Sequence, residues 1–428
     1  MEHYLPEIYW HDRKALLSIV TTSTQREVRI WSFDFENVGD SRNRAGLAVN
    51  FIANLEGHRG PVNIARFSPN GEILASGDCE GFIVESDEID AIPPNKENWV
   101  RMKQSVRHDY DVCWLCWSPD SSQIATVSND ESIIVYNVLL GARSWTVKNF
   151  RSFPNGIVWD PRGKYIVTMS TDRKLDILSA AKGIKLRTIS SIDLPQSGVR
   201  IFHFYVYKLF HDDQMMAFAR VADFSPCGEL LVAPSGHLEV GGSNIYASYI
   251  FRRSDFLNHY FLLVKCFQKV NNLTIINYNF IIFSIIMIII YYNFFRLPYR
   301  VVWAIMTKDS VSLYDSQSKL PFAYIDNIHY NSLSDVVWSY DGRVLLITSL
   351  EGYCNLHKFE WDICFLEEEK AISETTRSTP ERLKSEIRTP KKSAESHTLF
   401  KYLKKFDPSN ETIIESNECE LIKELVLN

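Results

Sequence analysis

The sequence lacks the short motifs that carry most enzyme chemistry. It contains no phosphate-binding loop, no nucleophile elbow, no HExxH zinc motif and no dinucleotide-binding glycine fingerprint. Cys113 and Cys116 form a CxxC pair, but a zinc or redox site would also need a second pair or a helix N-terminus. Because both cysteines fall in an expected strand, core packing explains them better. We therefore expect no enzyme activity, no metal and no cofactor.

A secretion signal and an excess of positive charge are also missing. Residues 1–10 carry charges and no apolar stretch, so we expect that the chain is not exported. Its eight cysteines are then expected to be free thiols in a reducing compartment. The formal net charge is −6, whereas a dedicated phosphate binder is basic. We therefore expect little direct binding to DNA.

What the sequence does contain is a repeated unit, clearest in residues 55–81. The unit opens with Gly-His, alternates apolar residues up to a Ser-Pro-Asn-Gly turn, alternates again and closes with Gly-Asp. Period-two runs on both sides of such a turn predict a β-hairpin. The Gly-His opening and the late Asp are typical of a WD-repeat propeller blade. We predict that His58 and Asp78 form a buried, hydrogen-bonded pair.

Related hairpins recur along the chain, as expected for a unit that cannot bury both of its faces alone. Their turns lie at positions 69, 119, 161, 226 and 340, so the spacings are 50, 42, 65 and 114 residues. Blades of about 40–45 residues with loop insertions fit these spacings, and the last interval has room for an extra blade. We predict an all-β fold, a seven-bladed WD-repeat propeller over residues 1–360. The structural blade turns are expected at His58, Asp78, His108, Asp130 and Asp172.

Three places depart from regular blades. Residues 7–11 alternate as a strand, which we expect to pair into the last blade and close the ring. The first blade that follows is too short, because only four residues separate Val20 from Gln25. The second blade is clipped, because residues 82–85 lack the usual aromatic ending. The fifth blade carries a long insertion over residues 190–210.

An uncharged run at residues 270–295 is open to three interpretations. It is long enough to span a bilayer at about 20 residues, but blades on both sides must close one ring, so we expect no membrane span. A single buried strand is excluded by the length of the run. Residues whose codons can consist of A and T alone dominate it. We therefore favour the third interpretation, a translated intron inserted into the propeller.

The tail, residues 361–428, mixes charge with Ser, Thr and Pro, which is typical of disorder with short interaction motifs. Within it, Leu399, Tyr402 and Leu403 lie at i, i+3 and i+4, on one face of a helical turn. This spacing resembles a degenerate sliding-clamp box. A short helix that docks on the protein's own complex is the alternative, and we favour it.

One polar cluster, His211, Asp212 and Asp213, follows Phe210 in an expected loop. The cluster has the residue types of an acid–base site. Its place in a loop of a binding fold favours a partner-binding role over catalysis.

Several segments outside the generic blade pattern carry a family resemblance. They are residues 7–11, 62–77, 95–99, 210–213, 297–300, 309–315, 327–330 and 352–354. Together they resemble the WD-repeat middle subunit of chromatin assembly factor one. The resemblance implies a nuclear, non-enzymatic scaffold that works with a large and a small subunit. It also implies that this histone chaperone complex deposits histones H3–H4 in replication-coupled nucleosome assembly.

The same resemblance implies a tail motif that docks on the anti-silencing histone chaperone. Ile387, Arg388 and Pro390 give the nearest match, without the usual preceding arginine pair. A propeller alone indicates only a binding platform. A WD-repeat adaptor of another complex, such as a ubiquitin-ligase substrate receptor, therefore stays open as an alternative. Co-purification with histones or with a cullin machinery separates the two.

Overall fold

The structure is a computed structural model, and it describes most of the region in which blades are predicted. The described residues are 8–13, 16–23, 26–34, 48–79, 83–84, 95–100, 102, 107–148, 150–195, 204–211, 219–240, 243–256, 262–265, 285–288, 300–316, 321–339, 342, 344–359 and 403–404.

Antiparallel strands make up nearly all of the regular structure in the N-terminal half. The first sheet holds β1 (Ile8–Arg13), β2 (Leu16–Thr22), β3 (Val28–Asp34) and β4 (Ala48–Leu55). The second holds β5 (Val62–Phe67), β6 (Leu74–Asp78) and β7 (Ile83–Val84). The third holds β8 (Val112–Trp117), β9 (Gln123–Ser128), β10 (Ser132–Asn137) and β11 (Ala142–Val147). The fourth holds β12 (Pro154–Trp159), β13 (Tyr165–Ser170), β14 (Lys174–Ser179) and β15 (Lys185–Ile189).

The C-terminal half continues the same plan. A hairpin of β16 (Ser191–Pro195) and β17 (Phe204–Lys208) precedes the fifth sheet. That sheet holds β18 (Asp223–Phe224), β19 (Leu230–Val240), β20 (Ser243–Arg252) and β21 (Leu262–Lys265), with a 3-10 turn, η1 (Arg253–Asp255), after β20. The sixth holds β22 (Ile285–Ile288), β23 (Arg300–Met306), β24 (Ser310–Asp315), β25 (Ala323–Asp326) and β29 (Leu403–Lys404). The last holds β26 (Leu333–Trp338), β27 (Val344–Ser349) and β28 (Cys354–Lys358).

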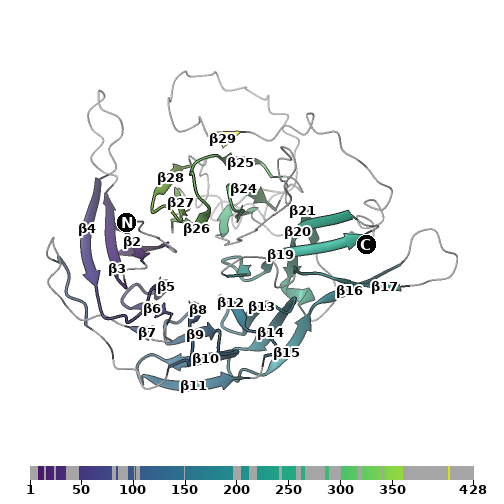
Figure 1. Ribbon diagram of the computed structural model, residues 1–428, viewed down its shortest axis with the longest axis horizontal. Coiled ribbons are helices and arrows are strands. Elements are labelled where there is room, and N and C mark those ends of the chain that lie inside the picture. The colour runs from purple at the N-terminus through teal and green to yellow at the C-terminus, as the bar shows by residue number, and fades with distance from the viewer. Residues whose placement is uncertain are drawn as a thin grey trace, which may run out of the picture.

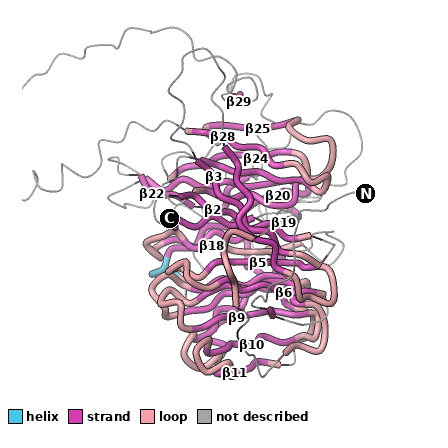
Figure 2. The backbone as a smooth tube through the Cα atoms, turned by 90° about the vertical axis from the view of Figure 1, so that its left-hand side faces the viewer, coloured by secondary structure: helices cyan, strands magenta, loops and turns pink. Residues whose placement is uncertain are grey.

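These sheets follow one another around a common centre, and the first sheet returns to the side of the last (Figure 1). Figure 2 shows the same strands in side view, with almost no helix. This is the all-β propeller that the hairpin repeats predict. The predicted number of seven blades stays a prediction.

Apolar side chains between neighbouring sheets hold the ring together. The innermost strands β5, β8 and β12 are buried along their length except at the fifth residue. Polar bonds then fix one sheet on the next: the Trp117 indole donates to the carbonyl oxygen of Arg66 at 2.9 Å, and the Trp145 indole donates to that of Ala180 at 2.9 Å. Because each aromatic ring is also half or fully buried, these bonds set the angle between sheets as well as their spacing.

The ring closes differently from the sequence-based expectation. β1 pairs with β2, with Ile8 opposite Thr21 and Arg13 opposite Leu16. The prediction that this strand joins the last blade is therefore wrong, and so is the prediction that the first blade is too short. Only two residues connect β1 to β2, so pairing them closes a minimal loop, whereas pairing with the last sheet spans the whole chain. β1 still lies beside β26 of the last sheet, but the two strands belong to different sheets.

The structure also bears on the clipped second blade and on the uncharged run at residues 270–295. The second sheet has three strands, and β7 has only two residues. In the run 270–295, residues Ile285–Ile288 form β22, which pairs with β23. This four-residue strand does not test the translated-intron interpretation, and the other residues of the run lie outside the described ones. Among the residues that the structure describes, no helix is long and apolar enough to cross a membrane.

Candidate functional site

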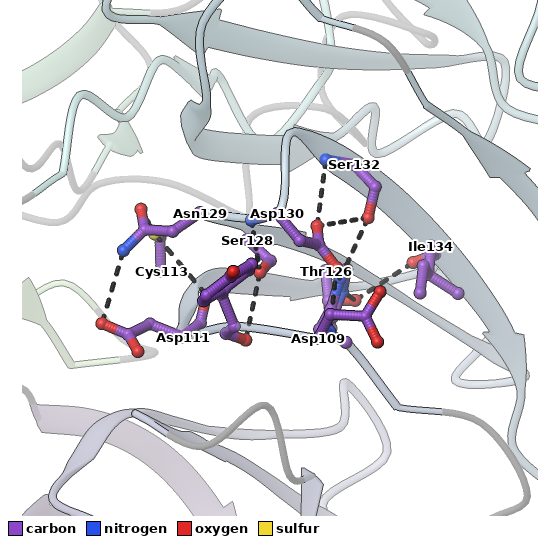
Figure 3. A network of polar contacts seen from close by, with 11 residues as sticks. Asp109, Asp111, Cys113, Thr126, Ser128, Asn129, Asp130, Ser132 and Ile134 are labelled. Atoms are coloured by element: carbon purple, nitrogen blue, oxygen red, sulfur yellow. Dashed lines mark hydrogen bonds and ion pairs between the residues drawn. The ribbon is translucent and has the colours of Figure 1, made fainter.

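A buried polar network surrounds Asp130 at one end of the third sheet (Figure 3). Nδ1 of His108 lies 2.9 Å from Oδ2 of Asp130, and Nε2 lies 2.7 Å from the hydroxyl of Thr126. The amides of Asp109 and Ser132 donate to the two oxygens of the same carboxylate at 3.1 and 3.0 Å. One carboxylate thus joins the loop before β8 to the turn between β9 and β10.

The charge of Asp130 is stabilised by this setting. Burial alone would raise the pKa of its carboxyl. The hydrogen bond with His108, the positive field of that ring and the bonds from Ser132 and Asp109 outweigh burial, and they hold the pKa well below its usual range. These partners already occupy the carboxylate oxygens. The network therefore stabilises the two loops and is not an open catalytic site.

Two more histidine–carboxylate pairs occur at corresponding positions. In the second sheet, His58 lies 3.0 Å from Asp78 and 2.7 Å from the hydroxyl of Ser76. In the last sheet, Nδ1 of His329 lies 3.2 Å from Oε1 of Glu351. Sequence reasoning missed this third case because Glu replaces Asp. The signal was the position of the histidine, which in all three sheets lies four residues before the innermost strand.

Asp172 holds its turn in another way. Its carboxylate accepts a hydrogen bond from the hydroxyl of Ser170 and forms an ion pair with Lys174, two residues further on. Asp172 therefore fixes the turn between β13 and β14 by local contacts.

The three histidine loops mark one face of the propeller, which we call the histidine face. The loop before each innermost strand and the turn between the second and third strands lie at the same end of an antiparallel sheet. Large exposed side chains stand in these loops: Tyr330 is 104% exposed, Tyr353 67% and Tyr110 64%. Exposed aromatic side chains of this kind anchor protein partners. The histidine face is therefore the candidate binding surface.

His211 belongs to the same end of the molecule. Its amide donates to the carbonyl oxygen of Ser235 at 2.8 Å, and its ring lies against that of His237, tilted by 40° with centroids 4.9 Å apart. The preceding carbonyl, of Phe210, accepts a bond from Arg173, which lies in the turn between β13 and β14. Asp212 and Asp213 lie outside the described residues. The structure thus places the start of the predicted cluster on the histidine face.

The tail residues proposed as partner motifs lie mostly outside the described part of the chain. This applies to Ile387, Arg388, Pro390, Leu399 and Tyr402. Leu403 is described and lies in the extended strand β29. The predicted helical turn is therefore wrong at Leu403, because the residue pairs with a strand edge instead.

Both thiols of the CxxC pair have raised pKa values. Burial raises the pKa of Cys113 to about 12, and burial together with the nearby Asp223 carboxylate raises that of Cys116 well above its ordinary value. Thiols with raised pKa values are poor nucleophiles and poor metal ligands. No cluster of three metal-ligating side chains occurs among the residues that the structure describes.

Comparison with known proteins identifies the propeller. A family model described as the CAF1B/HIR1 beta-propeller domain matches residues 1–363. The chain is 32% identical over 392 residues to a Gallus gallus protein named as the B subunit of chromatin assembly factor 1, covering 83% of this chain and 67% of that protein. It is 29% identical over 408 residues to the protein of the same name in Saccharomyces cerevisiae, covering 82% and 84%.

A more distant relative is "Protein hir1" of Schizosaccharomyces pombe. It is 25% identical over 378 residues, which cover 82% of this chain and 36% of that protein. The chain thus spans about two thirds of the length of the chicken relative and about a third of the histone-regulator relative. The match over most of its length shows that the chain belongs to the CAF1B/HIR1 β-propeller family.

Proposed function

We propose that this chain is a non-enzymatic scaffold subunit of a nuclear histone H3–H4 chaperone complex that assembles nucleosomes during DNA replication. The observation that carries the proposal is the family match over residues 1–363, together with relatives at 29–32% identity that are named as a subunit of chromatin assembly factor 1. The buried His–Asp networks support a scaffold, because their polar groups bond one another and hold strands together.

The proposed partners are the large and small subunits of that complex and histones H3–H4. The histidine face is the surface we assign to them. It combines the exposed rings of Tyr110, Tyr330 and Tyr353 with carboxylates in the same loops, Asp109 and Glu131. Exposed aromatic side chains of this kind suit protein partners.

The test is recovery of partners by the full-length chain. Purified wild-type chain should retain H3–H4 and the large subunit, and Tyr330→Ala with Tyr353→Ala should weaken at least one of these contacts. Leu139→Ala with Leu140→Ala is the matched control. Those side chains, 83% and 77% exposed, lie in the turn between β10 and β11, at the opposite end of the sheet.

Two outcomes would contradict the proposal. Recovery of a cullin ligase in place of histones would favour the adaptor alternative. Tight, salt-sensitive binding of the isolated chain to duplex DNA would contradict a partner role that depends on protein contacts, since the net charge is −6.

The tail motifs extend the same proposal. Residues 387–390 are proposed to dock on the anti-silencing histone chaperone. A peptide of residues 395–407 tests the sliding-clamp hypothesis by calorimetry. No heat at high micromolar concentration would remove the clamp from the list of partners.

A further inference from the structure

The sixth sheet is the one place where the tail meets the propeller in the described part of the chain. β29 adds to the outer edge of β25 as a fifth strand, with Leu403 opposite Ile325 and Lys404 opposite Tyr324. Figures 1 and 2 both place β29 outside β25. In the third, fourth and fifth sheets the outermost strands β11, β15 and β21 pair on one side only, as far as the structure describes the chain.

The edge of β25 is suited to receive a strand. Its other side is paired with β24 over Ala323–Asp326, so the strand is held flat and in a fixed register. Ile325 is fully buried, while Tyr324 and Ala323 are half-buried. An outer strand of this kind presents a row of backbone donors and acceptors, which another extended segment can pair with.

The edge of β25 is mostly apolar, and two carboxylates lie beside it. Burial raises the pKa of the Tyr324 phenol, and the carboxylates of Asp309 and Asp326 raise it further, against a hydrogen bond with Ser310 that lowers it. These two negative charges therefore lie near the position that pairs with Lys404.

The tail segment has the complementary composition. Residues 399–405 read LFKYLKK, with two aromatic residues, two leucines and three lysines. Aromatic residues favour strands, and three positive charges suit an acidic border. Pairing in cis gives the apolar residues of this segment a surface to cover.

The connection between propeller and tail permits this pairing. Residues 360–402 join Phe359 to Leu403, and a chain of that length at about 3.3–3.6 Å per residue is long enough to reach any edge of the ring. Tethering gives the segment an effective concentration on the order of millimolar at the edge. A short pairing that would be too weak between separate molecules can then persist.

We propose that the outer edge of β25 is a strand-docking site and that residues 399–405 of this chain are its resident strand. The tail thereby covers the edge in cis, and any outside strand that uses this site has to displace it. The site goes beyond the proposed chaperone role and depends on none of its partners.

Hydrogen exchange on the full-length chain tests the pairing. Residues of an antiparallel strand alternate between bonded and non-bonded positions, so only one of the two amides at 403 and 404 points toward β25. The variant Leu403→Pro with Lys404→Pro removes the donor whichever it is. The matched control is Ser393→Pro with Ala394→Pro, which adds two prolines to the same tail outside the segment.

The expected result is exchange about tenfold faster in residues 322–326 of the 403/404 variant, with the control and the wild type alike. A labelled peptide of residues 397–407 should also bind the 403/404 variant about tenfold or more tightly than the wild type, because the resident strand no longer competes. Lys401→Glu with Lys405→Glu keeps every backbone donor and should lower the protection of the same amides.

Three results would overturn the proposal. Unchanged exchange at 322–326 in the double-proline variant would show that the tail does not cover this edge. Equal peptide binding to variant and wild type would show that it does not compete there. Faster exchange at 142–147 or 185–189 instead would place the tail on the edge of β11 or β15.

An unchanged melting temperature confirms that each variant is folded.

Discussion

Nδ1 of His108 lies 2.9 Å from Oδ2 of Asp130, a contact that ties two loops separated by 22 residues. Replacing Asp130 by Ala removes the acceptor of the Asp109 and Ser132 amides. It also removes the carboxylate from the His108 ring, whose Nδ1 keeps the hydroxyl of Ser132 at 3.1 Å. A buried donor without a partner costs about 1–3 kcal/mol. We therefore expect Asp130→Ala to lower the free energy of unfolding by about that amount, measured by urea denaturation.

The matched control is Asp109→Ala in the same loop. The Asp109 residue is exposed, and only its backbone amide contacts Asp130. Its substitution is expected to change stability by less than about 0.5 kcal/mol. An equal change in the free energy of unfolding for the two substitutions would show that the carboxylate of Asp130 does not stabilise the fold.

His357 is expected to make the protein sensitive to mild acid. The side chain is 5% exposed in β28, and neither ring nitrogen has a hydrogen-bond partner among the described residues. Burial and the neighbouring His329 lower its pKa to about 4. A histidine in the unfolded chain titrates near 6.5, so the unfolded state binds an extra proton between these values. Stability is therefore present above pH about 6.5 and falls by roughly 1.4 kcal/mol per pH unit below it.

The measurement is the urea midpoint at pH 7.5 and pH 5 for wild type and His357→Gln. On going from pH 7.5 to pH 5 the variant, which cannot titrate at this position, should lose less stability than the wild type. The difference between the two proteins isolates His357 from Asp223, whose contribution has the opposite sign. His211→Gln is the control, because that residue is another histidine but is only half-buried, with its ring beside that of His237. The same slope in all three proteins would rule out His357 as its source.

The parts of the fold that could be predicted are those set by neighbouring residues. The turn at Ser68–Gly71 and the alternation on both sides gave β5 and β6, because side-chain period and turn chemistry act locally. The partner of β1 could not be predicted in this way. Its apolar alternation suits either the first or the last sheet, and the choice depends on loop closure and packing around the whole ring.

The candidate site could also be predicted only in part. His58 follows the Gly-His pattern, whereas His108 follows an arginine. His329 follows an isoleucine and pairs with Glu351 in place of an aspartate. At Leu403, spacing alone could not separate a helical turn from a strand. Apolar residues at i and i+4 share a face in both, and the β25 edge decides the conformation.

The mature protein should lack most of residues 270–295 if the run is a translated intron. Its lack of charge and its A/T-codable composition support this prediction, while Ile285–Ile288 form β22 when the run is present. Peptide mass spectrometry of the native protein is the measurement. Recovery of a peptide that contains residues 285–292 would contradict the prediction and make β22 a genuine strand of the sixth sheet.

Asp223 is expected to destabilise the protein at neutral and higher pH. Its Oδ1 accepts the amide of Phe224 at 2.8 Å, but burial raises its pKa to about 7. An unfolded aspartate titrates near 3.9. Between these values the native state holds a proton that the unfolded state has released, so stability falls as pH rises from about 4 to 7. Because the residue is only half-buried, we expect a loss of roughly 2 kcal/mol, about half of the full linkage value.

Asp223→Asn keeps an acceptor for Phe224 and removes the charge. It should raise the unfolding free energy at pH 8 and leave it unchanged near pH 4. Asp120→Asn is the opposite case, because bonds from Ser118 and Ser122 lower the pKa of Asp120, so its charge is stabilising. A gain from both substitutions would point to net charge and not to the burial of Asp223.

Gly156 of β12 lies against the backbone of the segment that precedes β18. A Cβ at this position would lie 1.9 Å from the carbonyl oxygen of Arg220 and 3.0 Å from Cα of Val221. Both atoms belong to backbone, and the Arg220 amide is itself bonded to the carbonyl of Asn155, at 3.3 Å, so the segment cannot move aside without losing that bond. Gly156→Ala should therefore cost at least about 3 kcal/mol, the upper range for overpacking.

Gly163→Ala separates this contact from a general effect of removing glycine. Gly163 has a φ of +71° and no neighbour within 4 Å of an added Cβ, so the strain of a left-handed conformation, about 1–2 kcal/mol, is its whole cost. Urea denaturation of the two variants gives the comparison. If Gly156→Ala loses no more than Gly163→Ala, the innermost strand of the fourth sheet does not lie against the segment before β18. The ring would then be wider at this point than the structure shows.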